Sequence, residues 1–179
     1  WYTHGWRWVP SEAVSQRTER GTVPYAGWVE DGYLLQTEGE VTDYSVIEAQ
    51  ILDAVEQFNV EMIAYDDWNA SDLVSRLVDQ QVPLIQFVQG TKSYHPAMQA
   101  LERAYVAGNL AHGGDPVLNW CASNLVARRD VNLNMAPDRK RSPDKIDDMA
   151  ALLMAFGLAV ASDGDGQDLS DFFNNAVIG

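Results

Sequence analysis

The strongest constraint on the fold is an alternation of helical and extended patterns between residues 44 and 88. From Tyr44 to Phe58 apolar residues recur every three to four positions, which predicts an amphipathic helix. The apolar run Glu61–Tyr65 then predicts a strand, residues 70–81 a second helix and residues 82–88 a second strand. Strands that alternate with helices are joined by crossover connections, which favour parallel pairing. The pattern therefore predicts an α/β fold with a largely parallel sheet.

Further elements are expected on both sides of this block. They are a strand within residues 1–9, a short strand at Tyr33–Thr37 in an otherwise irregular stretch, a helix at Pro96–Ala107, a short helix through Trp120, a hairpin turning at Asn132–Asn134, and a long helix from Ser142 to about Ala161. Ser142 can cap this last helix, and Pro143 can occupy its first position. We expect one domain over residues 1–162, followed by a polar C-terminal tail over residues 163–179.

Length and composition bound the class of protein. The 179 residues, 46% of them hydrophobic, suffice for one compact domain with a substantial core. The sequence contains no apolar run of about 18 residues and no signal-peptide pattern at its start, so we expect a soluble protein without membrane contact. A single cysteine excludes an internal disulfide and fits a reducing, intracellular compartment.

Charge is distributed unevenly. Acidic residues outnumber basic ones by 26 to 12, and the net charge of −14 argues against nucleic-acid binding through the whole surface. Half of the basic residues nevertheless form a basic strip within positions 128–145. The strip consists of Arg128, Arg129, Arg139, Lys140, Arg141 and Lys145. Two interpretations remain open, a phosphate contact and a solvated loop with a chance cluster of charge.

Two aspartate pairs occupy positions where apolar residues are expected. Asp66 and Asp67 follow the predicted strand at Tyr65, and Asp147 and Asp148 lie in the first turns of the predicted last helix. A buried carboxylate needs a cation, hydrogen bonds or solvent, and ligands of open α/β sheets bind at the carboxyl ends of strands. For the helical pair, a favourable interaction with the helix dipole is the alternative to a catalytic role.

Periodicity separates the members of one pair. Asp147 lies beside the apolar face of the predicted helix and Asp148 points nearly opposite, which makes Asp147 the better ligand candidate. Asp66 and Asp67 point to opposite sides of an extended strand, and the pattern does not distinguish between them.

Histidine and cysteine offer weaker alternatives. His95, His112 and Cys121 match no familiar spacing of zinc ligands. A nucleophile built from Cys121 and His112 is a second option, but the apolar surroundings of the cysteine favour a buried structural thiol.

Three long segments carry a resemblance to a known family. They read VPYAGWVEDGYLLQTEGEVTDY, IAYDDWNASDLVSRLVDQQVPLIQFVQG and HGGDPVLNWCASNLVARRDVNLNMAPDRKRSPDKIDDMAALLMAF. In order and spacing they resemble the nuclease domain of large terminase subunits of tailed double-stranded DNA bacteriophages. The resemblance implies an RNase H-like fold with a mixed central sheet flanked by helices. It also implies cleavage of concatemeric viral DNA with the help of two divalent metal ions, Mg²⁺ or Mn²⁺.

Roles follow from this resemblance residue by residue. Asp66 matches the acidic residue on a later strand and Asp147 the one at the start of the last helix, with Asp67 and Asp148 as further metal-ligand candidates. A third aspartate, on the first strand of the family fold, would precede residue 1. Lys92, in the segment QGTKS, and the basic strip would contact DNA phosphates.

The resemblance also implies a longer protein. The phosphate-loop pattern of an ATPase motor domain does not occur in this sequence, so contacts with the motor, the small terminase subunit and the portal would reside elsewhere. The protein would act in the cytoplasm of the bacterial host during virion assembly. Two alternatives remain: a noncatalytic module that binds DNA or docks packaging proteins, suggested by the missing first-strand aspartate, and another RNase H-like nuclease such as a junction resolvase.

Overall fold

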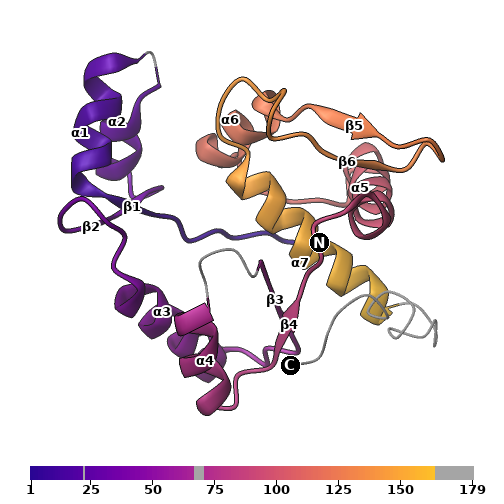
Figure 1. The fold of residues 1–179 in the computed structure, drawn as a ribbon, viewed down its shortest axis with the longest axis horizontal. Coiled ribbons are helices and arrows are strands. Elements are labelled where there is room, and N and C mark those ends of the chain that lie inside the picture. Colours follow the sequence, from indigo (N-terminus) through magenta and orange to yellow (C-terminus); the bar gives the residue numbers. More distant parts are fainter. Residues whose placement is uncertain (22, 67–70, 164–179) are drawn as a thin grey trace.

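Helices and short strands alternate along the chain in the computed structural model, which describes residues 1–21, 23–66 and 71–163 (Figure 1). The predicted tail, residues 163–179, lies outside the described residues from position 164 onward. The elements are β1 (Trp8–Pro10), α1 (Ser11–Arg20), α2 (Tyr25–Glu30), β2 (Leu35–Thr37), α3 (Tyr44–Gln57), β3 (Ile63–Tyr65), α4 (Ser71–Asp79), β4 (Leu84–Gln86), α5 (Thr91–Val106), α6 (Pro116–Asn124), β5 (Ala127–Arg129), β6 (Met135–Pro137) and α7 (Asp147–Asp163).

The α/β class is confirmed, and the strands pair two by two. β1 pairs with β2 and β3 with β4 in parallel, whereas β5 and β6 form an antiparallel hairpin. Both orientations occur, as expected of a mixed fold, but the described strands form three small sheets instead of one continuous sheet. β3 pairs with β4 along one edge, and residues 60–66 line a cavity beside α7.

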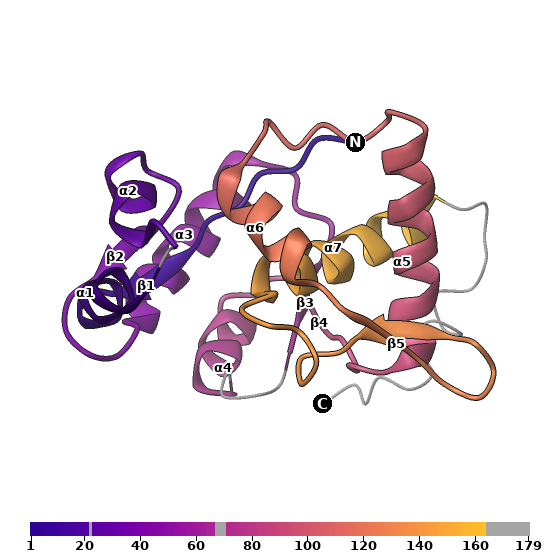
Figure 2. The same cartoon turned by 90° about the horizontal axis from the view of Figure 1, so that it is seen from above.

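The main core surrounds α7, which packs against α5 (Figure 2). Phe87, Tyr94, Leu101 and Leu153 are buried there, together with alanines of α5 and β6. Full burial of a large apolar side chain stabilises the fold by about 1.5–3 kcal/mol. The prediction that the last helix is buried is confirmed, and no helix in the described part of the chain is long and apolar enough to cross a bilayer.

A smaller core holds the N-terminal part of the chain. Tyr25 and Trp28 of α2 pack on each other with ring centroids 5.5 Å apart, and Trp120 of α6 lies 5.9 Å and 5.4 Å from them. Residues 21–43 are therefore not irregular throughout, and the sequence predicted neither α1 nor α2. The ten-residue α1 is mostly polar, and α2 has only six residues. Both helices therefore depend on tertiary contacts, and an apolar periodicity did not mark them in the sequence.

Two helix starts differ from the prediction. α5 begins at Thr91 and includes Pro96, which lacks the N–H that would bond to Lys92 one turn earlier. α7 begins at Asp147 and not at Ser142. The Ser142 hydroxyl donates to the Asp138 carbonyl oxygen at 2.8 Å and accepts from the Val126 N–H at 3.1 Å, so it fixes a loop and caps no helix.

Candidate functional site

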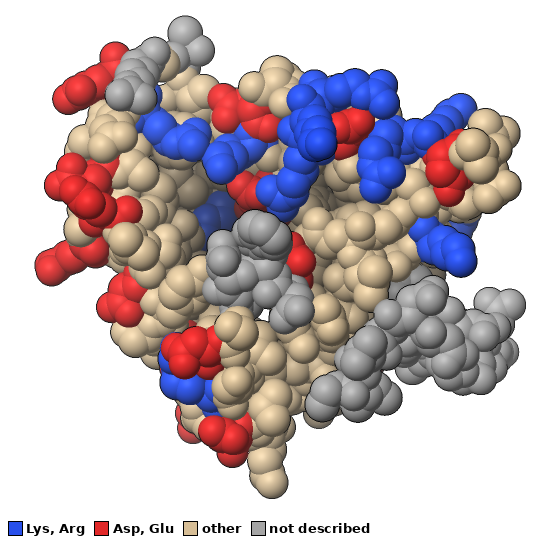
Figure 3. Space-filling view, viewed as in Figure 1, with Lys and Arg blue, Asp and Glu red and all other residues tan. Residues whose placement is uncertain are grey.

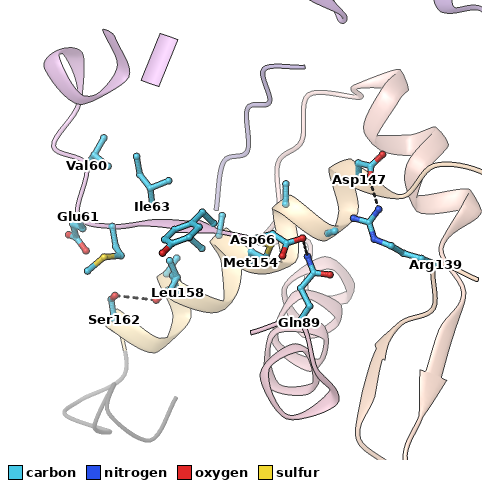
Figure 4. Close-up of a pocket in the computed structure, with 17 residues that line it drawn as sticks. Val60, Glu61, Ile63, Asp66, Gln89, Arg139, Asp147, Met154, Leu158 and Ser162 are labelled. Carbon is cyan, nitrogen blue, oxygen red and sulfur yellow. Dashed lines mark hydrogen bonds and ion pairs between the residues drawn. The ribbon is translucent and has the colours of Figure 1, made fainter. Parts of the chain in front are cut away.

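A cavity of about 660 Å³ separates β3 from α7 (Figure 4). Residues 60–66 form one wall, and the opposite wall is α7, whose small side chains Ala150, Ala151, Ala155 and Ala159 leave the space open. Asp66 and Asp147 line the same cavity, although they are 81 positions apart in the sequence. The fold thus brings one member of each predicted aspartate pair to a common site.

Asp66 follows β3 at the carboxyl end of the strand. Its Oδ2 accepts a hydrogen bond of 2.6 Å from Nε2 of Gln89, which follows the neighbouring strand β4. Because β3 and β4 are parallel, their carboxyl ends share one edge, which is where open α/β folds bind ligands. Sequence analysis missed Gln89, since nothing in its surroundings marks it apart from its place after a predicted strand.

Asp147 is the first residue of α7 and remains accessible. Its Oδ1 accepts a hydrogen bond of 2.7 Å from a guanidinium nitrogen of Arg139, and the Lys145 ammonium lies 4.0 Å from Oδ2. The side chain is 55% exposed. Exposed ion pairs of this kind are weak, so Arg139 can exchange Asp147 for another anion at little cost.

Asp148 faces a different part of the molecule. Its Oδ2 lies 2.5 Å from Nε of Arg7, and a second guanidinium nitrogen of Arg7 lies 2.9 Å from Asp115 at the start of α6. The Asp148 side chain is 17% exposed, and its burial raises the pKa above the ordinary value despite the hydrogen bond from Arg7. Asp148 lines a second cavity, beside residues 1–7, and not the one that contains Asp66.

The fourth predicted aspartate, Asp67, lies outside the described residues. Within the ranges that the structure describes, no three His, Cys, Asp or Glu side chains come together in an arrangement that could hold a metal ion. The lining of the cavity includes one aspartate from each predicted pair, together with Glu61.

The basic strip adjoins this cavity, because Arg139 lines it. A smaller cavity of about 410 Å³ is lined by Arg128, Arg139 and Lys140 and shares Gln89 and Arg139 with the first. Figure 3 shows lysine and arginine side chains gathered over the upper part of this face, above β5 and β6 and the loop that follows. An anion held along this surface would lie close to Asp66 and Asp147.

Hydrogen bonds hold the β5–β6 hairpin, which carries Arg128 and Arg129. Asp130 accepts bonds from the Asn132 and Asn134 N–H groups at the turn, and the Thr91 hydroxyl at the start of α5 donates to it at 2.8 Å. These bonds, with that of the Asn134 side chain foremost, lower the pKa of Asp130 to about 2. Lys92 is the next residue in α5, so the hairpin and the predicted lysine contact share one anchor.

Cys121 and His95 have structural surroundings. Cys121 is buried in α6, and burial raises the pKa of its thiol to about 11, which leaves it protonated at neutral pH. His95 uses Nδ1 to accept a hydrogen bond of 3.1 Å from the Met135 N–H. This geometry favours the interpretation of Cys121 as a structural thiol.

Comparison with known proteins identifies the family. A family model described as terminase large subunit, endonuclease domain, matches residues 1–163. The chain belongs to this family. It is 32% identical over 175 residues to the terminase large subunit of Enterobacteria phage HK97, a match that covers 96% of this chain and 35% of the relative. It is 30% identical over 162 residues to Protein YmfN of Escherichia coli strain K12, covering 86% of this chain and 35% of that protein.

A solved structure shows the same arrangement. The crystal structure of the HK97 bacteriophage large terminase superposes with a TM-score of 0.76 at 33% sequence identity, covering 84% of this chain and 32% of that one. The chain therefore spans about a third of the length of these relatives. The predicted resemblance to the nuclease part of large terminase subunits is confirmed.

Proposed function

We propose that this domain cuts double-stranded DNA with divalent metal ions held by Asp66 and Asp147. The observation that carries the proposal is the convergence of these two carboxylates on one cavity, bordered by Arg128, Arg139 and Lys140. Membership of an endonuclease-domain family supports it. Cleavage of concatemeric viral DNA during packaging is the corresponding role in the longer protein.

The residues of the cavity fit a hard divalent cation. Carboxylate oxygens are the preferred ligands of Mg²⁺ and Mn²⁺, and both aspartates present them to the same space. A two-metal site needs more protein oxygens than these two side chains supply. The edge of β3 that lines the cavity, opposite the alanines of α7, offers room for a further strand, which would carry the first-strand aspartate implied by the family.

The chain's own side chains would share the remaining work. Bound metal ions would activate water and neutralise charge on the scissile phosphate. Asp66 and Asp147 would hold these ions, and the Gln89 amide would orient the Asp66 carboxylate through its hydrogen bond. Arg139 would leave Asp147 and contact a phosphate oxygen instead. Asp148, paired with Arg7, would not serve as a ligand.

DNA contacts would position the duplex without reading its sequence. Lys92 and the basic strip present cations suited to phosphates, and phosphate contacts carry no base information by themselves. In the longer protein, the ATPase motor, the small terminase subunit and the portal would be further partners, acting in the cytoplasm of the bacterial host.

Plasmid nicking with Mn²⁺ or Mg²⁺ tests the proposal. The chain, the longer polypeptide that includes the implied first strand, and Asp66→Asn and Asp147→Asn variants of each would be compared. Asp53→Asn is the matched control, because Asp53 is exposed on α3, outside the cavity, where it accepts a hydrogen bond from Gln57. We expect metal-dependent nicking that each site substitution abolishes and the control preserves.

Two other outcomes would redirect the assignment. If the folded longer polypeptide binds DNA but cuts nothing with either metal, the noncatalytic module becomes the better interpretation. If four-way junctions are cut in strong preference to linear or plasmid DNA, the domain acts as a junction resolvase.

A further inference from the structure

Arg7 makes a buried contact that the proposed chemistry does not use. Its side chain is 10% exposed, and it bridges two carboxylates from distant parts of the chain: Asp115 at 2.9 Å and Asp148 at 2.5 Å. A further guanidinium nitrogen donates to the Gly5 carbonyl oxygen at 3.1 Å. Arg7, Asp115 and Asp148 form an ionic cluster where the N-terminal segment, α6 and α7 meet.

Both carboxylates belong to helix starts. Asp115 caps α6, because its Oδ1 accepts from the N–H groups of Val117 and Leu118 at 2.9 Å and 3.0 Å. Asp148 is the second residue of α7. The guanidinium therefore fixes the beginnings of two helices relative to each other. A planar guanidinium suits this role, since it can bond to two carboxylates in a set geometry.

The first turn of α7 is also held from α6. The Asn124 side chain donates to the Lys145 carbonyl oxygen at 3.2 Å, two residues before the helix begins. Asp147 itself has only exposed partners, so its direction depends on the backbone of this turn. Consecutive residues of a helix are about 100° apart, so a fixed Asp148 determines where Asp147 points.

We infer that Arg7 is a positioning residue for the metal site: by clamping Asp148 to Asp115, it fixes the turn that directs Asp147 into the cavity beside Asp66. The inference rests on the proposed function and extends it to a residue that touches no part of that cavity. The positive charge of Arg7 also reduces the repulsion between the Asp115 and Asp148 carboxylates at the junction of α6 and α7.

Mn²⁺ binding without DNA tests the inference, measured as the loss of the free-ion signal in electron paramagnetic resonance. The longer polypeptide that includes the implied first strand would be compared with its Arg7→Met, Arg7→Lys and Asp148→Asn variants, all below their melting temperatures as checked by circular dichroism. Arg103→Met is the matched control, because Arg103 is an exposed arginine of α5 outside both cavities. Residues that orient metal ligands contribute about tenfold or more to affinity.

We expect Arg7→Met to weaken Mn²⁺ binding about tenfold, Arg7→Lys to lose less, and Arg103→Met to bind as wild type does. Asp148→Asn should weaken binding as well, and the Arg7→Met/Asp148→Asn double variant should lose no more than the worse single variant. This non-additivity is the signature of one clamp.

Other outcomes are distinguishable. Suppose that folded Arg7→Met binds Mn²⁺ as wild type does, while Asp147→Asn loses binding. This result would overturn the positioning role of Arg7 and leave the proposed metal site intact. If Arg7→Met does not fold, the same comparison applies to Arg7→Lys, which retains the charge. If the Asp66→Asn and Asp147→Asn variants bind Mn²⁺ as tightly as wild type does, both the metal site and the positioning role of Arg7 are refuted.

Discussion

Asp147 and Asp148 are neighbours in the sequence and differ in almost every physical respect. Asp147 is more than half exposed, pairs weakly with Arg139 and Lys145, and borders a cavity of about 660 Å³. Asp148 is part-buried and shares one guanidinium with Asp115. Of the two carboxylates, Asp147 therefore has the partners that are more easily displaced, whereas Asp148 and its part-buried partner hold two helix starts together.

The sharpest test of this comparison is cleavage by Asp147→Asn in the longer polypeptide. Removing a ligand charge should lower the nicking rate by about 100-fold or more, because metal-assisted charge stabilisation is worth several kcal/mol. Stability should change by no more than about 0.5 kcal/mol, since the side chain is exposed. Gel-based kinetics and urea denaturation measure the two effects, and a large stability loss would erase the contrast with Asp148.

Loss of the Arg7 ion pairs should affect stability more than loss of the exposed pair between Arg139 and Asp147. Arg7→Met leaves two partly buried carboxylates unpaired and should lower the free energy of unfolding by about 3 kcal/mol. Arg139→Met breaks the exposed pair with Asp147 and should cost about 0.5 kcal/mol or less. Urea denaturation of both variants gives the comparison directly. Equal losses would mean that burial does not separate the two ion pairs.

The exposed basic residues near Asp147 should also contribute to DNA binding. Replacing Arg139, Lys140 and Arg141 together by glutamine should weaken binding of a short duplex and reduce the slope of log affinity against log salt by about 2 to 3. Arg76→Gln, on α4, is the control, since Arg76 pairs with Glu48 and Asp72 away from this strip. Fluorescence anisotropy at several salt concentrations measures the slope, and an unchanged slope would remove the strip from the interface.

A smaller effect should appear at low pH, where Asp130 offers an intermediate case held by hydrogen bonds. Folding lowers its pKa from the ordinary 3.8 to about 2, so the stabilisation is fully present above 3.8 and is lost as the pH falls through 2. The protection factors of the β5–β6 amides, which correct for the intrinsic pH dependence of exchange, should fall over that window. Asp130→Asn should show faster exchange already at neutral pH, and a pH-independent hairpin would contradict the assignment.

Local periodicity predicted the regular part of the fold well. The helix at Tyr44–Phe58 and the strand at Glu61–Tyr65 match α3 and β3, because both are encoded by contiguous apolar patterns. The hairpin turn predicted at Asn132–Asn134 also lies between β5 and β6. The predicted start of α7 was wrong, because serine is a common helix cap and Ser142 matched that pattern. In the structure the Ser142 hydroxyl accepts a hydrogen bond from the Val126 N–H, a contact that the local sequence does not reveal.

The candidate site, too, could be predicted from the sequence only in part. Its candidate carboxylates could be selected from the sequence, because Asp66 follows a predicted strand, Asp147 lies at the start of an apolar helix, and both fall in segments that resemble the family. Arg7 could not, since it lies 108 positions before Asp115 and 141 before Asp148, and no local pattern relates residues so far apart. Gln89 was missed for the same reason, because its bond to Asp66 joins the ends of two separate strands.

The buried clamp has a practical consequence at high ionic strength. Salt at about 1 M reduces the range of electrostatic interaction to about 3 Å at the surface but screens buried pairs much less. A concentrated salt wash should therefore release nucleic acid from the exposed arginines while the guanidinium of Arg7 keeps its two carboxylates. The domain can be stripped of copurifying DNA without loosening the turn that carries Asp147.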